Sequence, residues 1–185
     1  MERCQSGRMG HPAKVLCLHG HRGFESLPLR QTHLLNPIML KQLQKIGSPI
    51  TCPVAIIMRD RKILIGHRHY TPDKWKKISV WTCPGGRCDS RESIETTLRR
   101  EIEEETGITN IKIHDYIGEV AGAKKGDLVP VFFCTTNQEA KLIEPHKFSE
   151  WQWISFEDFA NGLPNNFINE DVRIIVIKFL SKMFK

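Results

Sequence analysis

The sequence lacks the long apolar run that a membrane-spanning helix needs, because none of its 185 residues fall in a stretch of about 18 consecutive apolar residues. It also lacks a low-complexity bias, since 13 glycines and 10 prolines follow no repeating pattern. Hydrophobic residues make up 40% and charged residues 26%, which excludes a wholly disordered chain. Length and composition therefore predict one globular domain with a short additional segment.

Closely spaced cysteine pairs are missing as well. The six cysteines include no two with C-x-x-C spacing, so a zinc knuckle, a redox-active pair and a secreted disulfide framework all lack support. The residues near Met1 contain no uninterrupted apolar segment of the kind found in secretory signals. We therefore expect reduced thiols and a cytoplasmic protein.

The excess of positive charge is small. The formal net charge is +6, and residues 1–38 contribute half of it with five basic and two acidic residues. The remainder has no basic stripe interleaved with aromatic side chains, so we expect no stable nucleic-acid partner. An anionic small molecule suits this charge equally well. The oligomeric state is left open, and a homodimer is one of the alternatives.

Residues 1–38 show neither a period of 2 nor a period of 3.6, and we expect no packed element there. Gly23-Phe24-Glu25-Ser26 can be encoded by GGG-TTC-GAA-TCC, and such DNA resembles the T-arm of a tRNA gene. We therefore interpret this segment as a disordered tail or as the product of a misassigned start, with Met39 as the real start. A mitochondrial-type transit peptide is the third alternative. The folded domain is expected to span residues 39–185.

Short apolar runs and amphipathic segments alternate after residue 39. Apolar runs rich in Val and Ile predict strands over residues 52–58, 63–68, 80–82, 111–120, 128–135 and 150–154. A turn over residues 59–62 predicts that the first two strands form a hairpin. Helices are expected over residues 92–106, 156–160 and 169–183. For the 92–106 helix, Asp89 or Ser90 is the expected N-cap and Gly107 the expected C-cap.

The 92–106 helix carries an unusual set of acidic residues. At about 100° per residue, three carboxylates lie on or beside its apolar stripe of Ile94, Leu98 and Ile102, namely Glu101, Glu104 and Glu105. Glu103 instead fits a solvated face and can pair with Arg99. Carboxylates gathered at the edge of a core repel one another and resist desolvation. A divalent cation would relieve both costs, and all-oxygen ligands favour Mg²⁺ or Mn²⁺ over zinc, together with a phosphate-bearing substrate.

The spacing of these residues is more specific than their charge. Gly86 is followed at fixed intervals by Glu92, then by Arg100-Glu101-Ile102, Glu104-Glu105 and Gly107-Ile108. This pattern resembles the Nudix box, G-x5-E-x7-R-E-U-x-E-E-x-G-U with U apolar, at every specified position. Nudix enzymes hydrolyse a nucleoside diphosphate linked to another group and need Mg²⁺ or Mn²⁺. The resemblance implies an α/β fold in which an α/β/α sandwich is built around a mixed β-sheet.

The resemblance also implies roles for individual residues. Metal ligands would be Glu101, Glu104 and Glu105, with the Gly86 carbonyl as a further ligand. Arg100 would orient a carboxylate, and Glu92 would brace the junction between loop and helix through Arg100. The general base is left open, with Glu104 and Glu101 as the first candidates.

Several residues outside the box are candidates for substrate binding. Arg68 ends the second predicted strand and can reach a phosphate, with an ordinary solvated charge as an equally good interpretation. Three lysines of the polar loop, Lys74, Lys76 and Lys77, are weaker candidates for the same contact. Trp81, with Tyr70 and Trp75 as rivals, is a candidate wall for a base pocket.

The segment Glu144-Pro145-His146-Lys147, followed by Trp151-Gln152-Trp153, resembles the MutT-type nucleoside triphosphate pyrophosphohydrolases. By this resemblance Glu144 would assist the metal site, and Asn169 would contact the base. The alternatives are a surface-loop residue for Glu144 and a helix N-cap for Asn169. The two tryptophans share one strand face and are expected in the core rather than against a base.

The leading hypothesis is hydrolysis of a nucleoside triphosphate to the monophosphate and pyrophosphate. A second hypothesis keeps the chemistry but takes ADP-ribose, a sugar nucleotide or a dinucleoside polyphosphate as the substrate. A third is a Nudix-fold module that binds nucleotides without turnover. The complete set of box residues argues against the third hypothesis, because loss of the carboxylates is what would mark an inactive site.

Overall fold

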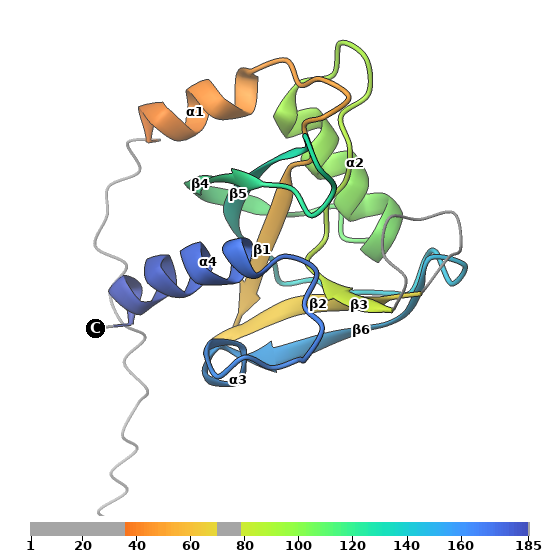
Figure 1. The fold of residues 1–185 in the computed structure, drawn as a ribbon, viewed down its shortest axis with the longest axis vertical. Helices are drawn as coiled ribbons and strands as arrows, with labels where there is room; N and C mark the ends of the chain where they lie inside the picture. The colour runs from red at the N-terminus through yellow and green to blue at the C-terminus, as the bar shows by residue number, and fades with distance from the viewer. Residues whose placement is uncertain (1–35, 70–78, 185) are drawn as a thin grey trace, which may run out of the picture. The chain divides into compact units, whose positions relative to one another are not determined.

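The structure is a computed structural model that describes residues 36–69 and 79–184. Most of the segment interpreted as a tail lies outside the described residues. So does the polar loop that contains Tyr70, Lys74, Trp75, Lys76 and Lys77. The described elements are α1 (Pro37–Gln44), β1 (Val54–Arg59), β2 (Lys62–Arg68), β3 (Val80–Thr82), α2 (Ile94–Thr106), β4 (Lys112–Ala121), β5 (Leu128–Thr135), β6 (Phe148–Ser155), α3 (Phe156–Ala160) and α4 (Glu170–Met183) (Figure 1).

The six described strands form one mixed sheet. Their order is β3-β2-β1-β5-β4, and β6 pairs with β2 outside this path. β1 and β5 run parallel, with Val54 opposite Val131 and Met58 opposite Thr135. The other pairings are antiparallel. The expected mixed sheet is therefore confirmed.

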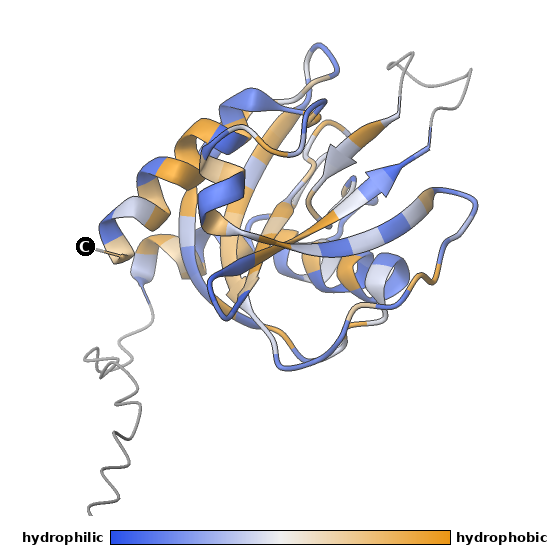
Figure 2. Cartoon of the chain, turned by 90° about the horizontal axis from the view of Figure 1, so that it is seen from below, coloured by the Kyte–Doolittle hydropathy of each residue, from blue (hydrophilic) through white to orange (hydrophobic). Residues whose placement is uncertain are grey.

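Helices cover both faces of this sheet. β1 is buried on both sides, because Ala55 and Ile57 point into one apolar cluster while Ile56 and Met58 point into the other. Residues of α1 and α2 complete the first cluster, and residues of α3 and α4 complete the second. Figure 1 shows the two helix pairs on opposite sides of the strands. Apolar residues accordingly concentrate in the central strands and hydrophilic residues in the loops (Figure 2). The expected α/β/α sandwich is confirmed.

The turn between β1 and β2 has the geometry of a tight hairpin. Asp60 and Arg61 have φ angles of 49° and 59°, and positive values at both central positions match the twist of the flanking strands. Met58 lies opposite Ile63 and Arg59 opposite Lys62. The predicted hairpin is confirmed.

The helix α1 was not expected from the sequence. It begins at Pro37, and the Asn36 side chain caps it by accepting a hydrogen bond from the Ile38 backbone N–H at 3.0 Å. Met39 and Leu43 are 2% and 3% exposed, so this helix is packed into the domain. The domain boundary predicted between residues 38 and 39 falls within its first turn.

The start of α2 differs from the expectation. Its N-cap is Ser93, whose hydroxyl accepts a hydrogen bond from the Thr96 N–H at 3.1 Å, so the prediction of Asp89 or Ser90 is wrong. The helix therefore begins two residues later than expected, and Glu92 stays outside it. The C-cap prediction is confirmed, because Gly107 has a φ of 69° and donates to the Glu103 carbonyl.

The aromatic pair of β6 belongs to the core. Trp151 and Trp153 pack against the apolar cluster of α1 and α2, as expected from their shared strand face. The Trp151 ring lies against Gly66 of β2, where any side chain would overlap it. No helix within the described part of the chain is long and apolar enough to cross a membrane.

Candidate active site

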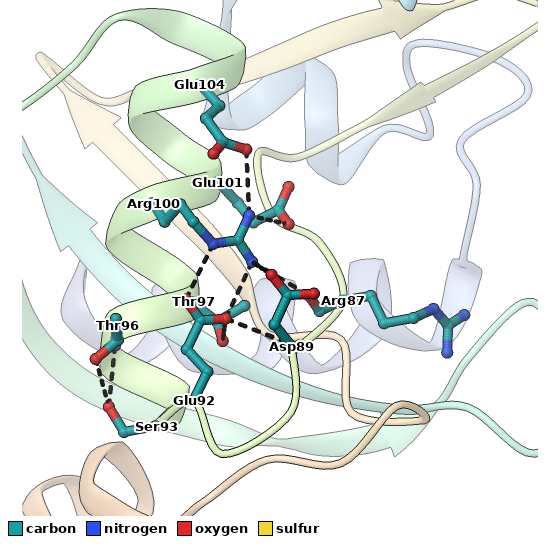
Figure 3. Close-up of polar contacts among 9 residues, drawn as sticks. All are labelled: Arg87, Asp89, Glu92, Ser93, Thr96, Thr97, Arg100, Glu101 and Glu104. Atoms are coloured by element: carbon teal, nitrogen blue, oxygen red, sulfur yellow. Dashed lines mark hydrogen bonds and ion pairs between the residues drawn. The ribbon is translucent and has the colours of Figure 1, made fainter.

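An arginine in the middle of α2 gathers the acidic residues around it. The Arg100 guanidinium donates to both carboxylate oxygens of Glu92 at 3.0 Å. Its Nη1 donates to Glu101 at 2.9 Å and to Glu104 at 3.1 Å. Figure 3 shows these carboxylates converging on one guanidinium from the same side of the helix. The structure therefore brings together four residues that the sequence placed in the site.

Glu92 fastens the loop before α2 to the helix itself. Because it precedes the N-cap, its carboxylate folds back and accepts hydrogen bonds from the Thr97 hydroxyl at 2.6 Å and the Asp89 N–H at 3.2 Å. The hydrogen bonds from Arg100 are the main cause that lowers the pKa of Glu92 from 4.5 to about 2. A carboxylate held this way stays charged and stabilises the junction over the whole neutral range.

Two carboxylates of α2 are withdrawn from solvent. Glu105 is 3% exposed and accepts a hydrogen bond from the Gly85 N–H at 3.1 Å, yet burial raises its pKa to about 8. Burial likewise raises the pKa of Glu101, against the opposing effect of Arg100. The Glu101 carboxylate lies so close to Gly86 that a Cβ at this position would overlap it. Gly86 therefore lets the loop approach Glu101, while Gly85, with a φ of 147° and the Pro53 backbone where a Cβ would lie, presents its N–H to Glu105.

Glu104 differs from these two. Its side chain is 49% exposed, so only two of the three carboxylates expected beside the apolar stripe are withdrawn from solvent. The pairing expected for the neighbouring Glu103 is also different, because Arg99 forms its ion pair with Glu95 at 2.9 Å.

A cavity of about 640 Å³ opens beside these residues, within the usual size range of small-molecule sites. Several elements and loops meet around it, among them the Gly85-Gly86 loop, the end of β2, α2, the turn between β4 and β5 and the segment that leads into α4. Its acidic lining includes Glu101 and Glu105, and its basic lining includes Arg68, Lys124 and Lys147. Phe167, Ile168 and Asn169 contribute apolar and amide surface.

Two of the three predicted substrate-binding residues line the cavity, and the third does not. Arg68 and Asn169 line the cavity. Asn169 is also the N-cap of α4, accepting from the Asp171 and Val172 N–H groups, while its Nδ2 donates to the Ala121 carbonyl at 2.8 Å. Trp81 is not among the lining residues; its ring packs against His67 with 4.8 Å between centroids.

Some lining residues received no role from the sequence. Lys147 forms an ion pair with Glu144 at 2.7 Å and lines the same cavity. Arg87 and Asp127 pair at 2.6 Å across the cavity rim and connect the glycine loop to the turn between β4 and β5. Phe167 lies between two helices in a segment without periodicity. The signal that could have identified Lys147 was its position within the Glu144–Lys147 motif.

The residues fit a hard divalent cation. The Glu144 carboxylate pairs with Lys147 through Oε1, while its other oxygen, Oε2, is buried and has no hydrogen-bond partner among the described residues, which leaves an acceptor position that a cation can fill. Glu101 and Glu105 have hydrogen-bond partners, but both are withdrawn from solvent in the cavity lining, so a cation there would offset the cost of burying their charge. Within residues 36–69 and 79–184, no three metal-binding side chains converge into a ready cage. Mg²⁺ needs no such cage, because it binds through a few carboxylates together with waters and substrate phosphates.

A model of the NUDIX domain matches residues 51–175, more than half of the chain. The chain belongs to the Nudix family. This Nudix domain contains every residue of the Arg100 network and of the cavity lining.

Known relatives and structures place it within the family. NudC of Mannheimia succiniciproducens, an NAD-capped RNA hydrolase, is 27% identical over 113 residues, covering 60% of this chain and 42% of that protein. An RNA pyrophosphohydrolase of Gluconobacter oxydans is 26% identical over 138 residues, covering 61% of this chain and 78% of that protein. A MutT NUDIX hydrolase from Burkholderia pseudomallei has a similar structure, with a TM-score of 0.52, 26% identity and coverage of 69% and 95%. The chain thus spans less than half the length of the NudC relative.

Proposed function

We propose that this Nudix domain hydrolyses a nucleoside triphosphate to the monophosphate and pyrophosphate, using Mg²⁺ or Mn²⁺. The observation that carries the proposal is a single cavity with two kinds of lining. Buried carboxylates and cations suit a metal-bound polyphosphate, and an apolar and amide surface suits a nucleoside.

The cation would be held by the carboxylates of α2 and by the loop residue with the unsatisfied oxygen. The ligands in this proposal are Glu101, Glu104, Glu105, Glu144 and the Gly86 carbonyl. When bound, the ion would neutralise charge on the phosphates and lower the pKa of an attacking water.

The protein's own groups would arrange the reaction. Arg100 is a positioning residue in this proposal, because it contacts Glu101 and Glu104 while Glu92 fixes its orientation. Of the two candidate bases, Glu101 lines the cavity and Glu104 does not, which supports Glu101. A carboxylate there can accept the proton of a water that attacks phosphorus.

The remaining lining residues would bind the two ends of the substrate. Arg68 and Lys147 carry positive charge next to the buried carboxylates, since both act electrostatically on Glu105. They would hold phosphate oxygens that the cation does not reach. Phe167 and Asn169 would contact the nucleoside. Four described cysteines are free thiols, which supports a working place in the reducing cytoplasm.

The relatives favour a second candidate. Two of them are named for activity on RNA, one as an NAD-capped RNA hydrolase and one as an RNA pyrophosphohydrolase. In this case the same cleft would take a phosphoric anhydride at the 5′ end of an RNA, and the chemistry at phosphorus would not change.

A substrate panel separates the candidates. The full chain would be incubated with Mg²⁺ or Mn²⁺ and with nucleoside triphosphates, ADP-ribose, diadenosine tetraphosphate, NAD, 5′-triphosphate RNA and NAD-capped RNA. Chromatography of the products, with pyrophosphate measured apart from orthophosphate, should show monophosphate and pyrophosphate from free triphosphates as the fastest reaction. Faster cleavage of the RNA ends would establish the second candidate, and absence of turnover on the whole panel would refute both.

A further inference from the structure

A second arginine is buried on the other side of the sheet. Arg173 of α4 is 3% exposed. Its Nη1 donates to the Phe159 carbonyl at 3.4 Å and the Leu163 carbonyl at 3.3 Å, and its Nη2 donates to the Pro164 carbonyl at 2.8 Å. Its hydrogen-bond partners are therefore backbone carbonyls in the last turn of α3 and in the segment that follows it.

Aromatic rings complete the surroundings of this guanidinium. The Phe159 and Phe167 rings lie 5.1 Å and 4.9 Å from its central carbon. The two rings meet each other edge to face, with 5.3 Å between their centroids. The contacts of the guanidinium with the two rings stabilise a cation that is shielded from water. The exposed Glu170 carboxylate forms an ion pair with the buried Nε of Arg173 at 3.2 Å. This contact does not have the geometry of a hydrogen bond.

The segment that follows the turn held by Arg173 forms one wall of the cavity. Residues 167–169 line it, and the Phe167 ring touches both the guanidinium and the cavity. Two hydrogen bonds tie the segment to β3, from the Trp81 N–H to the Asn166 carbonyl and from the Ile168 N–H to the Trp81 carbonyl. β3 therefore fixes the residues at 166–168, whereas Arg173 fixes the preceding turn.

Burying a guanidinium is expensive, and packing alone does not require one. An apolar side chain could fill the same space, but it would leave three carbonyls without these donors. The planar fork of arginine can donate in several fixed directions at once, which a lysine cannot do. The group therefore fixes the turn from which the chain enters the wall, and its contact with the Phe167 ring reaches the wall itself.

We propose that Arg173 is a positioning residue that sets the shape of the nucleoside-binding wall formed by Phe167, Ile168 and Asn169. The inference rests on the proposed function, because it assigns the nucleoside end of the substrate to this wall. Arg173 does not line the cavity, and it acts through the backbone that it holds.

The test compares binding at the two ends of the cavity in the full chain. Arg173→Lys keeps the charge but loses the fork, and Glu170→Gln is the matched control that leaves the guanidinium in place. Binding of AMP and GMP, and separately of Mg²⁺-pyrophosphate, would be measured by calorimetric titration. Arg173→Lys should raise the Kd for the two monophosphates about tenfold or more, because small displacements of binding groups have effects of this order. The Kd for pyrophosphate, and both values in Glu170→Gln, should stay within about twofold of wild type. In turnover of triphosphates, KM should rise while kcat changes little.

A milder variant covers the case in which Arg173→Lys does not fold. Phe159→Leu removes one ring beside the guanidinium and leaves the cavity lining unchanged, and it should weaken monophosphate binding selectively by a smaller factor. Equal loss of monophosphate and pyrophosphate binding, or no loss, in the folded variants would overturn the inference while leaving the proposed function intact. A wild-type chain that binds neither ligand would instead overturn the proposed function, and the inference with it.

Discussion

Two arginines of this Nudix domain, Arg100 and Arg173, each organise their surroundings, but in different ways. Arg100 contacts side-chain carboxylates at 2.9–3.1 Å and keeps 28% of its side chain exposed. Arg173 contacts backbone carbonyls and keeps 4% exposed. The first arranges charge where a metal-bound phosphate is proposed to react, and the second arranges backbone where a nucleoside is proposed to bind.

The difference shows why one site is visible in the sequence and the other is not. Apart from the Arg87 carbonyl at 3.3 Å, the hydrogen-bond partners of Arg100 are side chains at fixed intervals along one loop and helix, so the sequence shows their types and spacing. The partners of Arg173 are carbonyls, which every residue has. A contact to the backbone leaves no side-chain pattern, and only the fold reveals it.

The largest effect should come from neutralising a carboxylate beside Arg100. Glu104→Gln should lower kcat by roughly 10²- to 10⁴-fold, the range of a lost acid–base or ligand group. The free energy of unfolding should change little, because the side chain is half exposed. Steady-state kinetics with thermal unfolding would check both. The matched control is Glu103→Gln, an exposed neighbour, and near-normal turnover in Glu104→Gln would exclude a ligand or base role.

A second, smaller effect should follow from loosening Arg100 without touching the carboxylates that it orients. Glu92→Gln removes the charge that fixes the guanidinium at 3.0 Å, and loss of such an orienting group typically costs about 10- to 100-fold in activity or metal affinity. The Kd for AMP should stay unchanged, because the wall held by Arg173 is untouched. A selective loss of AMP binding would break the division of roles between the two arginines.

The two sites should also respond differently to acid. The pKa of Glu92 is lowered from 4.5 to about 2, so this group stabilises the folded state above pH 4.5 and loses that contribution as pH falls toward 2. Denaturant unfolding between pH 5 and 2 should show a loss in wild type that is smaller in Glu92→Gln. Arg173 has backbone partners on its buried side, so Arg173→Lys should show the same acid-induced loss as wild type. Equal slopes in wild type and Glu92→Gln would contradict the assignment.

The smallest effect is expected at Trp81. Its ring packs against His67 and does not line the cavity, so Trp81→Phe should change KM by less than about twofold. Phe167→Leu, in the wall itself, should raise KM more. If KM rises in Trp81→Phe as much as in Phe167→Leu, Trp81 contacts the substrate and this assignment is wrong.

Much of the fold follows from local pattern, with two instructive exceptions. Central strands such as β1 are continuous apolar runs, and Gly107 ends α2 as its position indicates. The helix α1 was missed because its eight residues follow a segment with no periodicity, and its burial depends on distant contacts with α2 and β4. The N-cap of α2 was misplaced because Glu92, inside the expected helix, folds back to Arg100.

The residues of the candidate site also fall into two groups, those that the sequence identified and those that only the fold reveals. Glu101, Glu105 and Gly86 were identified by spacing, and the structure places all three on the cavity. Lys147, Asp127 and Phe167 belong to the same cavity but come from three separate loops. Only the topology brings these loops together, so neither spacing nor composition could assign Asp127 and Phe167, and only the Glu144–Lys147 motif pointed to Lys147.

The central claim is that the carboxylates of α2 hold a divalent cation at the cavity, and binding of Mn²⁺ tests it most directly. Electron paramagnetic resonance titration should be carried out with wild type, Glu101→Gln and the exposed control Glu103→Gln, each with and without a non-hydrolysable nucleoside triphosphate. The account predicts a saturable Mn²⁺ site in wild type and Glu103→Gln that the nucleotide tightens and that Glu101→Gln loses. Equal Mn²⁺ binding in all three proteins, or none in any of them, would contradict it.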